Sequence, residues 1–291
     1  MTDLMSPPAP RDASDAGVGP AESGRGAAVG AFLRGLGVVE CGPRSFPFDP
    51  GYDAGTLAGH VNQSHELMAG LKLSMGTWLL VAEESLRDKV RIVRDHGLPM
   101  TVGGSLFEIS ADRDRLPEYF DLCHRLGITG VEAGHGFTQV TLDPRAVVRM
   151  AADRGLTISF EVGAKHDGPF HPAVVDELLE LGGSWLEAGA THLVVEARES
   201  AVGVGLFDSD GRLNCGLADA FAAAFGLERV VFEAPNKGSQ FAFIDHFGPK
   251  VALGNIRLEE LLRVETYRRG LHSDAYGRGL LGAGDGGARA C

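Results

Sequence analysis

The chain has 291 residues, 44% of them hydrophobic, and a formal net charge of −12. This acidity argues against a nucleic-acid surface, although a small anion can still bind in a locally positive pocket. No apolar run approaches the roughly 18 residues of a membrane span, and the N-terminus lacks a signal-peptide core. We therefore expect a cytoplasmic protein with no membrane or nucleic-acid partner.

The two ends of the chain differ in composition from the rest. Residues 1–30 contain mainly Pro, Ala, Gly, Ser and Asp with almost no large apolar side chain, which predicts a disordered tail. Residues 276–291 are similarly poor in large side chains and are expected to form a flexible C-terminal tail. Residues 31–275 between them are close to the roughly 250 residues of one (β/α)₈ barrel.

Short apolar segments alternate with amphipathic ones along this central part. Strands are predicted at 45–49, around Lys72, at 99–104, before four successive glutamates, and at 250–255. Helical patterns begin near Glu83, Asp112, Asp143 and Pro172, and several end at glycine, as at Gly97, Gly127 and Gly155. Regular alternation of strand and helix favours a parallel sheet, here a single-domain α/β fold of the (β/α)₈ TIM-barrel type.

The four glutamates form the most informative pattern in the sequence. Apolar runs end at Glu132, Glu161, Glu196 and Glu233, with spacings of 29, 35 and 37 residues, about one strand and helix unit each. Because the ends of parallel barrel strands meet at one mouth, these carboxylates should converge there. Crowding them in an apolar barrel is costly without compensation. A bound cation or a cationic substrate-binding set is one interpretation, and a structural network with Lys or Arg is the other.

Motifs at the predicted strand ends resemble one enzyme family. They are GLKLSMGT around Lys72, GGSLFE ending at Glu108, EVGAK ending at Lys165, EARES from Glu196, EAP from Glu233, and LGNI around Asn255. In this order, from about residue 49 to residue 274, they resemble the phosphosulfolactate synthase family. The resemblance implies a (β/α)₈ barrel, a carbon–sulfur lyase that adds sulfite to phosphoenolpyruvate with Mg²⁺.

The resemblance and the chemistry together assign expected roles to individual residues. Lys165 is the expected proton donor, and Lys72 and Arg198 are the expected binders of substrate anions. For each of these three cations, a salt bridge to a neighbouring glutamate is the alternative. Carboxylate oxygens suit Mg²⁺, so the expected metal ligands, or groups that orient them, are Glu132, Glu161, Glu196 and Glu233.

Phosphate in such barrels is usually bound by the last two loops and by backbone amides. Those loops contain Gly254, Asn255, Lys237 and Gln240. Ser105 follows two glycines and could provide a further group of amide donors. We expect these five residues to bind the substrate or its phosphate.

The sequence also departs from the family pattern near the mouth. Ala164, Ala252 and His272 replace a lysine, an asparagine and an arginine of that pattern, and His135 stands in a changed stretch after Glu132. His135 could act as an acid or base, or it could be an ordinary solvated loop residue.

Because the changes remove cationic and polar groups, three functions remain open. The first is the family reaction, the second is addition of sulfite or another nucleophile to a different acceptor, and the third is a non-catalytic relative similar to a stress protein. In each enzymatic case the partners are small anionic substrates. Barrels of this kind often form symmetric homo-oligomers.

Overall fold

The computed structural model describes residues 26–138, 140–163 and 168–281. The chain divides into two units, Met1–Leu36 and Gly37–Cys291. In the first unit the structure describes one helix, α1 (Ala27–Gly35), with no buried side chain. This helix crosses the boundary that we expected at residue 30, and the remainder of the predicted tail, residues 1–25, lies outside the described residues.

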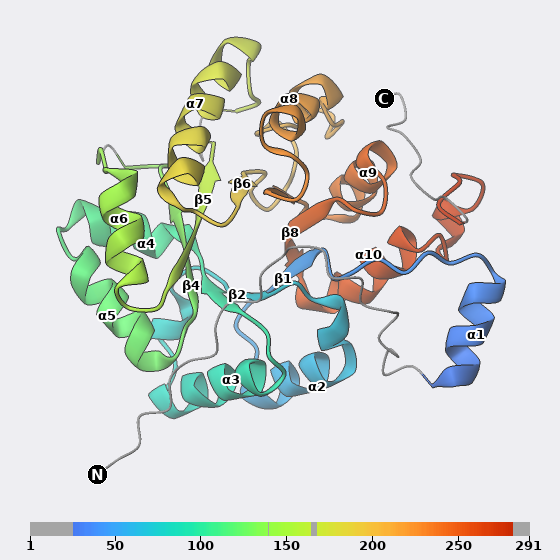
Figure 1. Ribbon diagram of the computed structural model, residues 1–291, viewed down its shortest axis with the longest axis horizontal. Coiled ribbons are helices and arrows are strands. Elements are labelled where there is room, and N and C mark those ends of the chain that lie inside the picture. Colours follow the sequence, from blue (N-terminus) through green and yellow to red (C-terminus); the bar gives the residue numbers. More distant parts are fainter. Residues whose placement is uncertain (1–25, 139, 164–167, 282–291) are drawn as a thin grey trace. The chain divides into compact units, whose positions relative to one another are not determined.

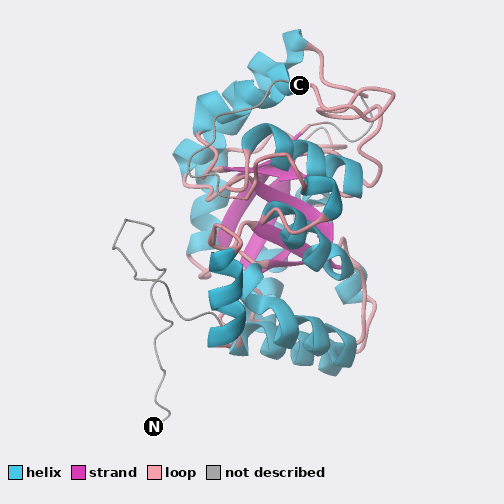
Figure 2. Ribbon diagram, turned by 90° about the vertical axis from the view of Figure 1, so that its right-hand side faces the viewer, coloured by secondary structure: helices cyan, strands magenta, loops and turns pink. Residues whose placement is uncertain are grey.

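The second unit is a closed barrel of eight parallel strands in sequence order, with β1 paired to β8 (Figure 1). Figure 2 shows the strands at the centre of this unit and helices around them. The predicted (β/α)₈ barrel is therefore confirmed. The strands are β1 (Ser45–Asp49), β2 (Leu71–Leu73), β3 (Met100–Val102), β4 (Gly130–Gly134), β5 (Thr157–Val162), β6 (Leu193–Val195), β7 (Val230–Glu233) and β8 (Ala252–Arg257).

Helices follow the strands in turn. They are α2 (Ala54–Ser64), α3 (Glu83–Asp95), α4 (Gly104–Asp112), α5 (Leu116–Leu126), α6 (Pro144–Ala152), α7 (Pro172–Ala188), α8 (Cys215–Phe225), α9 (Lys237–Phe247) and α10 (Leu261–Arg268). Short 3₁₀ turns are η1 (His65–Leu67), η2 (Thr77–Leu79), η3 (Leu258–Glu260) and η4 (Ser273–Ala275). Within the described residues, no helix has the length and apolar character needed to cross a bilayer.

The predicted start and stop signals explain where several helices begin and end. Asp143 caps α6 by accepting a hydrogen bond from the backbone N–H of Arg145. Gly127 ends α5 in the left-handed conformation, with φ of 81°. The helical pattern that begins near Asp112 corresponds to α5, which begins at Leu116, because the preceding helix α4 ends at Asp112.

The apolar core has two parts. The larger part lies between the strands and the helices and includes Phe107, Phe160 and Phe232. A smaller cluster of Val194, Val231 and Ala252, with Phe46 packed against it, is separate from it. Side chains alternate along a strand, and this smaller cluster comes from alternating positions on β1, β6, β7 and β8. We therefore assign it to the barrel interior.

Candidate active site

The carboxyl ends of the strands bring buried acidic side chains together, as the sequence predicted. Glu132, Glu161 and Glu233 lie on β4, β5 and β7, and Glu196 directly follows β6. The four residues are only 2–5% exposed. The alternation of β7 explains the direction of Glu233, since it lies two positions after the interior Val231.

Lys72 supplies a positive charge inside this group. Its Nζ lies 3.3 Å from Glu132 Oε1 and 3.5 Å from Glu233 Oε1. Burial alone would lower the pKa of Lys72, but the negative charges of Glu132, Glu233 and Glu161 outweigh it and raise that pKa above its usual range. The ammonium group is therefore charged at neutral pH, and the salt-bridge alternative for Lys72 is realised in this structure.

A second interaction joins Glu196 and Glu233. Burial, the charge of Glu196 and a hydrogen bond with the Glu196 carboxyl group together raise the pKa of Glu233 to about 8, against the opposing effect of Lys72. The other oxygen of Glu233, Oε2, accepts the backbone N–H of Ala197 at 3.0 Å. Two carboxyl groups thus share one small volume and retain a proton between them near neutral pH.

These carboxyl groups suit a magnesium ion, although they do not surround one point. In the described part of the chain, no three His, Cys, Asp or Glu side chains are grouped closely enough to hold a metal ion. Magnesium commonly uses only one or two protein carboxylates and completes its octahedron with water and substrate oxygens. The Glu196–Glu233 pair fits this requirement, while Glu132 is occupied by Lys72.

The N-terminus of α4 faces Glu132. The helix begins immediately after β3, and the backbone N–H of Gly104 points at Glu132 Oε1 over 3.4 Å. Ser105, the second residue of the helix, is half-buried. The predicted group of amide donors around Ser105 is therefore a helix N-terminus, where the helix dipole favours negative charge.

Glu108, also on α4, holds the loop that follows β4. It is 1% exposed, and its Oε2 accepts the backbone N–H groups of Gly136, Phe137 and Thr138 at 2.9, 3.0 and 3.2 Å. Its Oε1 has no hydrogen-bond partner among the described residues. Glu108 ends the GGSLFE motif, but the sequence alone indicated no role for its side chain.

A cavity of about 650 Å³ lies beside this loop. A Cβ atom at Gly134 would come within 3.1 Å of Glu108 Oε1 and would lie 3.7 Å from Glu161 Oε1, so glycine leaves room for both carboxyl groups. His135 is exposed and lines the cavity. Its other lining residues include Phe137, Glu161, Phe170, Val174 and Leu178.

The loops after β6, β7 and β8 are hydrogen-bonded to one another. Arg198 adopts a left-handed backbone conformation with φ of 55°, its N–H donates to Glu196 Oε1, and its carbonyl accepts from Asn255 Nδ2 at 3.4 Å. Asn236 Nδ2 donates to the carbonyl of Ser200. Arg198 and Ser200 line a second cavity of about 540 Å³. Left-handed non-glycine residues tend to occur at functional sites.

Of the residues predicted to bind phosphate, some lie beside the glutamates and others are engaged in contacts with other side chains. Gly254 and Asn255 lie on β8 close to Glu233, which pairs with Gly254. Lys237 is half-exposed at the start of α9, and its Nζ lies 2.7 Å from Asp274 Oδ2. We expected the ammonium group of Lys237 to bind phosphate, but in this structure it pairs with Asp274. The role of Lys237 in phosphate binding therefore stays a prediction.

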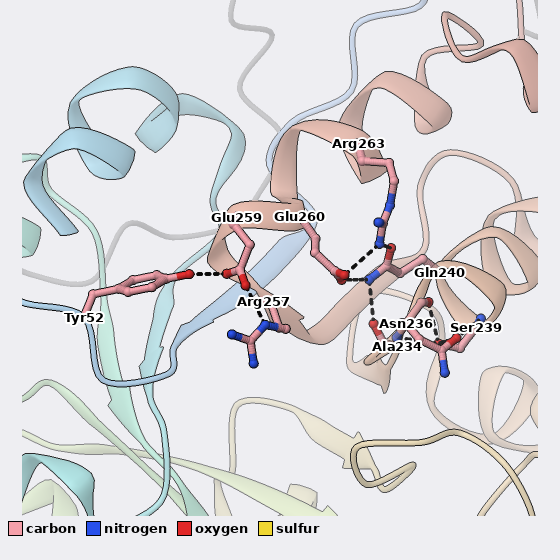
Figure 3. A network of polar contacts seen from close by, with 9 residues as sticks. All are labelled: Tyr52, Ala234, Asn236, Ser239, Gln240, Arg257, Glu259, Glu260 and Arg263. Atoms are coloured by element: carbon pink, nitrogen blue, oxygen red, sulfur yellow. Dashed lines mark hydrogen bonds and ion pairs between the residues drawn. The ribbon is translucent and has the colours of Figure 1, made fainter. Parts of the chain in front are cut away.

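Gln240 is fully buried and its amide is used internally. Nε2 donates to the carbonyl of Ala234 and to Glu260, and Oε1 accepts from Arg263 (Figure 3). Gln240 therefore holds the loop after β7 in this structure, and contact between its amide and a ligand would require these bonds to break.

Two of the departures from the family pattern have packing or hydrogen-bond contacts in this structure. Ala252 packs in the small interior cluster, one interior position before Gly254. His272 caps η4 by accepting the N–H of Asp274 and contacts the ring of Phe241 edge-on. An effect of these two departures on anion binding therefore stays a prediction. Lys165, the expected proton donor, and Ala164 lie outside the described residues.

Comparison with known proteins identifies the family. Residues 46–274 match the family described as (2R)-phospho-3-sulfolactate synthase. Phosphosulfolactate synthase of Methanocaldococcus jannaschii is 32% identical over 248 residues, which cover 85% of this chain and 96% of that protein. Phosphosulfolactate synthase of Bacillus subtilis is 30% identical over 235 residues, covering 80% and 92% respectively.

Similarity to solved structures is limited to the fold. The carboxyl transferase domain of Rhizobium etli pyruvate carboxylase has a TM-score of 0.54 at 13% identity, over 80% of this chain and 42% of that one. 3-Dehydroquinate dehydratase from Geobacillus kaustophilus has a TM-score of 0.50 at 12% identity, over 79% and 92%. The family match and the relatives carry the assignment: this chain belongs to the phosphosulfolactate synthase family and is a carbon–sulfur lyase of that type.

Proposed function

We propose that this enzyme catalyses the Mg²⁺-assisted addition of sulfite to phosphoenolpyruvate to form phosphosulfolactate. The observation that carries the proposal is the arrangement of Lys72 between Glu132 and Glu233, with Glu196 beside Glu233, at the end of the barrel where such enzymes carry out their chemistry. Family membership supports the same reaction.

The proposed reaction forms one bond and moves one proton. The sulfur of sulfite attacks the methylene carbon of phosphoenolpyruvate, and the electron pair of the double bond moves to the phosphate-bearing carbon and its carboxylate. Protonation of that carbon completes the addition, and the phosphate ester stays intact. The dianionic charge that develops before protonation is the feature that an active site must stabilise.

The residues of this chain take distinct parts in that scheme. Lys72 keeps its positive charge, because the neighbouring carboxylates raise its pKa, and it attracts the substrate carboxylate. Asn255 and the amides near Gly254 bind phosphate, and the N-terminus of α4 adds donors on the opposite side of the mouth. Lys165, assigned from its motif, protonates the carbon and regains its proton from solvent.

Magnesium would be held by the Glu196–Glu233 pair. Glu132 and Glu161 would orient neighbouring groups, such as water or the ammonium group of Lys72. When bound, the ion supplies electrostatic stabilisation of negative charge on a substrate oxygen. The donor set is all-oxygen, as a hard cation prefers.

A direct assay tests the proposal. The full chain is incubated with phosphoenolpyruvate, sulfite and Mg²⁺, and the phosphorus NMR spectrum is followed with mass detection of the product. We expect a new phosphate ester with the mass of phosphosulfolactate, formed only when sulfite is present. If phosphoenolpyruvate stays unchanged at high enzyme concentration while the protein is folded, the acceptor is a different molecule.

A further inference from the structure

A β-bulge in β8 directs Arg257 toward the mouth of the barrel. On β1, Phe46 and Pro47 are consecutive, but their partners on β8 are Gly254 and Ile256, so Asn255 is the extra residue. Asn255 has a left-handed φ of 53°. Bulges of this kind change the direction of the side chains that follow them, and the next residue, Arg257, pairs with Phe48.

Phe48 shows which way Arg257 faces. Side chains alternate along β1, so Phe48 shares the interior side with Phe46. Phe48 also pairs with Lys72, whose ammonium group lies among the glutamates. The guanidinium of Arg257 lies over the Phe48 ring, 5.9 Å from its centre. Arg257 is therefore a second cation on the side of the mouth formed by β1 and β8.

Two neighbours fix the orientation of this guanidinium. Arg257 Nε donates to Glu259 Oε1 at 2.6 Å, and the hydroxyl of Tyr52 donates to Glu259 Oε2 at 2.5 Å. Figure 3 shows this chain of contacts from Tyr52 through Glu259 to Arg257. Glu259 thus engages Nε, and Tyr52 also forms a hydrogen bond with the guanidinium. A guanidinium carries five N–H donors, so N–H groups at its terminal nitrogens remain for a ligand.

We propose that Arg257 binds the phosphate group of the substrate, and that Glu259 and Tyr52 are positioning residues for it. A planar guanidinium with two terminal nitrogens matches two oxygens of a phosphate, and a bidentate contact of this kind is stronger than a neutral hydrogen bond. The side chain of Arg257 is 46% exposed, so phosphate reaches it without rearrangement. A purely structural ion pair at such an exposed site would contribute little and would not need a tyrosine to orient its carboxylate.

The identity of the ligand as phosphoenolpyruvate rests on the proposed function, whereas phosphate binding itself does not. Calorimetric titration of the full chain with inorganic phosphate, phosphoenolpyruvate and pyruvate separates the two groups of the substrate. Replacement Arg257→Gln should weaken inorganic phosphate and phosphoenolpyruvate at least tenfold each and leave pyruvate unchanged, and Arg257→Lys should lie between. Equal loss of pyruvate and phosphoenolpyruvate with phosphate unaffected would assign Arg257 to the carboxylate and overturn the proposal.

The positioning residues have their own test. Glu259→Gln and Tyr52→Phe leave the arginine in place, so they should weaken phosphate binding by a smaller factor and raise KM for phosphoenolpyruvate more than they lower kcat. The matched control is Arg87→Gln, because Arg87 is an exposed arginine paired with Glu83 on α3, and it should bind phosphate as the wild type does. Wild-type affinity in a folded Arg257→Gln variant, or no phosphate binding by the wild type, would refute the inference. If phosphate binding is lost as expected but no phosphosulfolactate forms, only the proposed reaction fails.

Discussion

Among the described residues, Lys72 and Lys89 are two lysines with little exposed side chain, and they differ in what surrounds them. Lys89 Nζ lies 2.7 Å from Asp49 Oδ2, and Asp49 also accepts the N–H groups of Gly51 and Tyr52. Lys72 instead faces Glu132 and Glu233 with Glu161 nearby. Lys89 thus neutralises one carboxylate, whereas Lys72 faces several carboxylates. Unbalanced buried charge lowers the stability of the fold, and groups in such surroundings often belong to binding sites.

This difference predicts distinct outcomes for two matched variants. Lys72→Met and Lys89→Met each break a buried ion pair and should each lower the free energy of unfolding by about 3–5 kcal/mol. Only Lys72→Met should also abolish turnover, because it removes the cation that faces the substrate. Urea unfolding and steady-state kinetics measure the two effects separately. If Lys72→Met kept its kcat, Lys72 would be a structural residue like Lys89.

The raised pKa of Glu233 predicts how stability depends on pH. Between its ordinary value of 4.5 and about 8, the folded protein keeps a proton on this residue that the unfolded chain has lost. The folded state therefore binds more protons in this range, so Glu233 makes the protein less stable as pH rises from 4.5 to 8. Lys72 keeps its proton throughout the same range and does not reverse the sign.

A neutral replacement isolates this effect. In EDTA, Glu233→Gln should gain stability relative to the wild type as pH rises from 5 to 8, by up to about 1.4 kcal/mol for each pH unit. The measurement is the free energy of unfolding in urea at several pH values, with Glu83→Gln, an exposed helix residue, as the control. A constant difference between Glu233→Gln and the wild type would mean that Glu233 is ionised throughout this range.

At the scale of single elements, the sequence predicted where the strands end, but the directions of loop side chains could not be read from it. The four glutamates were found because strand residues alternate and parallel strands end together. Gln240 and Lys237 were expected at the ligand, yet one is buried in hydrogen bonds and the other pairs with Asp274. The sequence did not indicate that Arg257 lies at the mouth, because the direction of its side chain depends on the bulge at Asn255. A one-residue change of strand register has no recognisable pattern in the sequence.

The loop between β4 and α6 depends on Glu108 for its shape. Glu108→Ala would leave three backbone N–H groups without their acceptor, and we expect a loss of about 1–3 kcal/mol of stability. The amides of Gly136, Phe137 and Thr138 should then exchange with solvent faster, and KM should rise because this loop lines the cavity beside Glu161. Hydrogen exchange with mass spectrometry and steady-state kinetics provide the two measurements.

Two further variants distinguish loop anchoring from general destabilisation. In Glu108→Gln the amide oxygen can still accept the three N–H groups, so exchange and KM should return most of the way to wild-type values. Asp143→Ala removes the cap at the other end of the same loop, which costs about 1 kcal/mol but should leave KM unchanged. If Glu108→Gln behaved like Glu108→Ala, the charge of Glu108 and not its hydrogen bonding would be the important property.

At the scale of the whole molecule, the barrel explains why residues far apart in sequence form one site. The site combines Lys72 of β2, the start of α4, and carboxylates from four later units, which only a closed sheet brings together. Length and the alternation of strand and helix predicted this architecture from the sequence, because each repeating unit leaves a regular apolar pattern. The pairing of particular charges within the mouth depends on side-chain directions, which composition and spacing do not encode.

Among the residues that the structure describes, several glutamates surround Lys72, and we predict that a divalent metal stabilises the entire fold. A ligand that binds only the folded protein adds about 2.7 kcal/mol of stability at one hundred times its Kd, which for a domain of this size is a rise in Tm of roughly 5–10 °C. Mg²⁺ should produce such a rise and restore turnover after EDTA treatment.

Replacement of both Glu196 and Glu233 by glutamine should remove the Mg²⁺-dependent rise in Tm, because these are the proposed ligands. The double variant no longer has adjacent acidic groups, so it should itself be at least as stable as the metal-free wild type at pH 8. Glu83→Gln, which alters an exposed carboxylate on α3, should retain the full magnesium effect. Turnover that continues unchanged in excess EDTA, together with a Tm that Mg²⁺ does not alter, would show that these carboxylates need no divalent ion and that the chemistry proceeds without one.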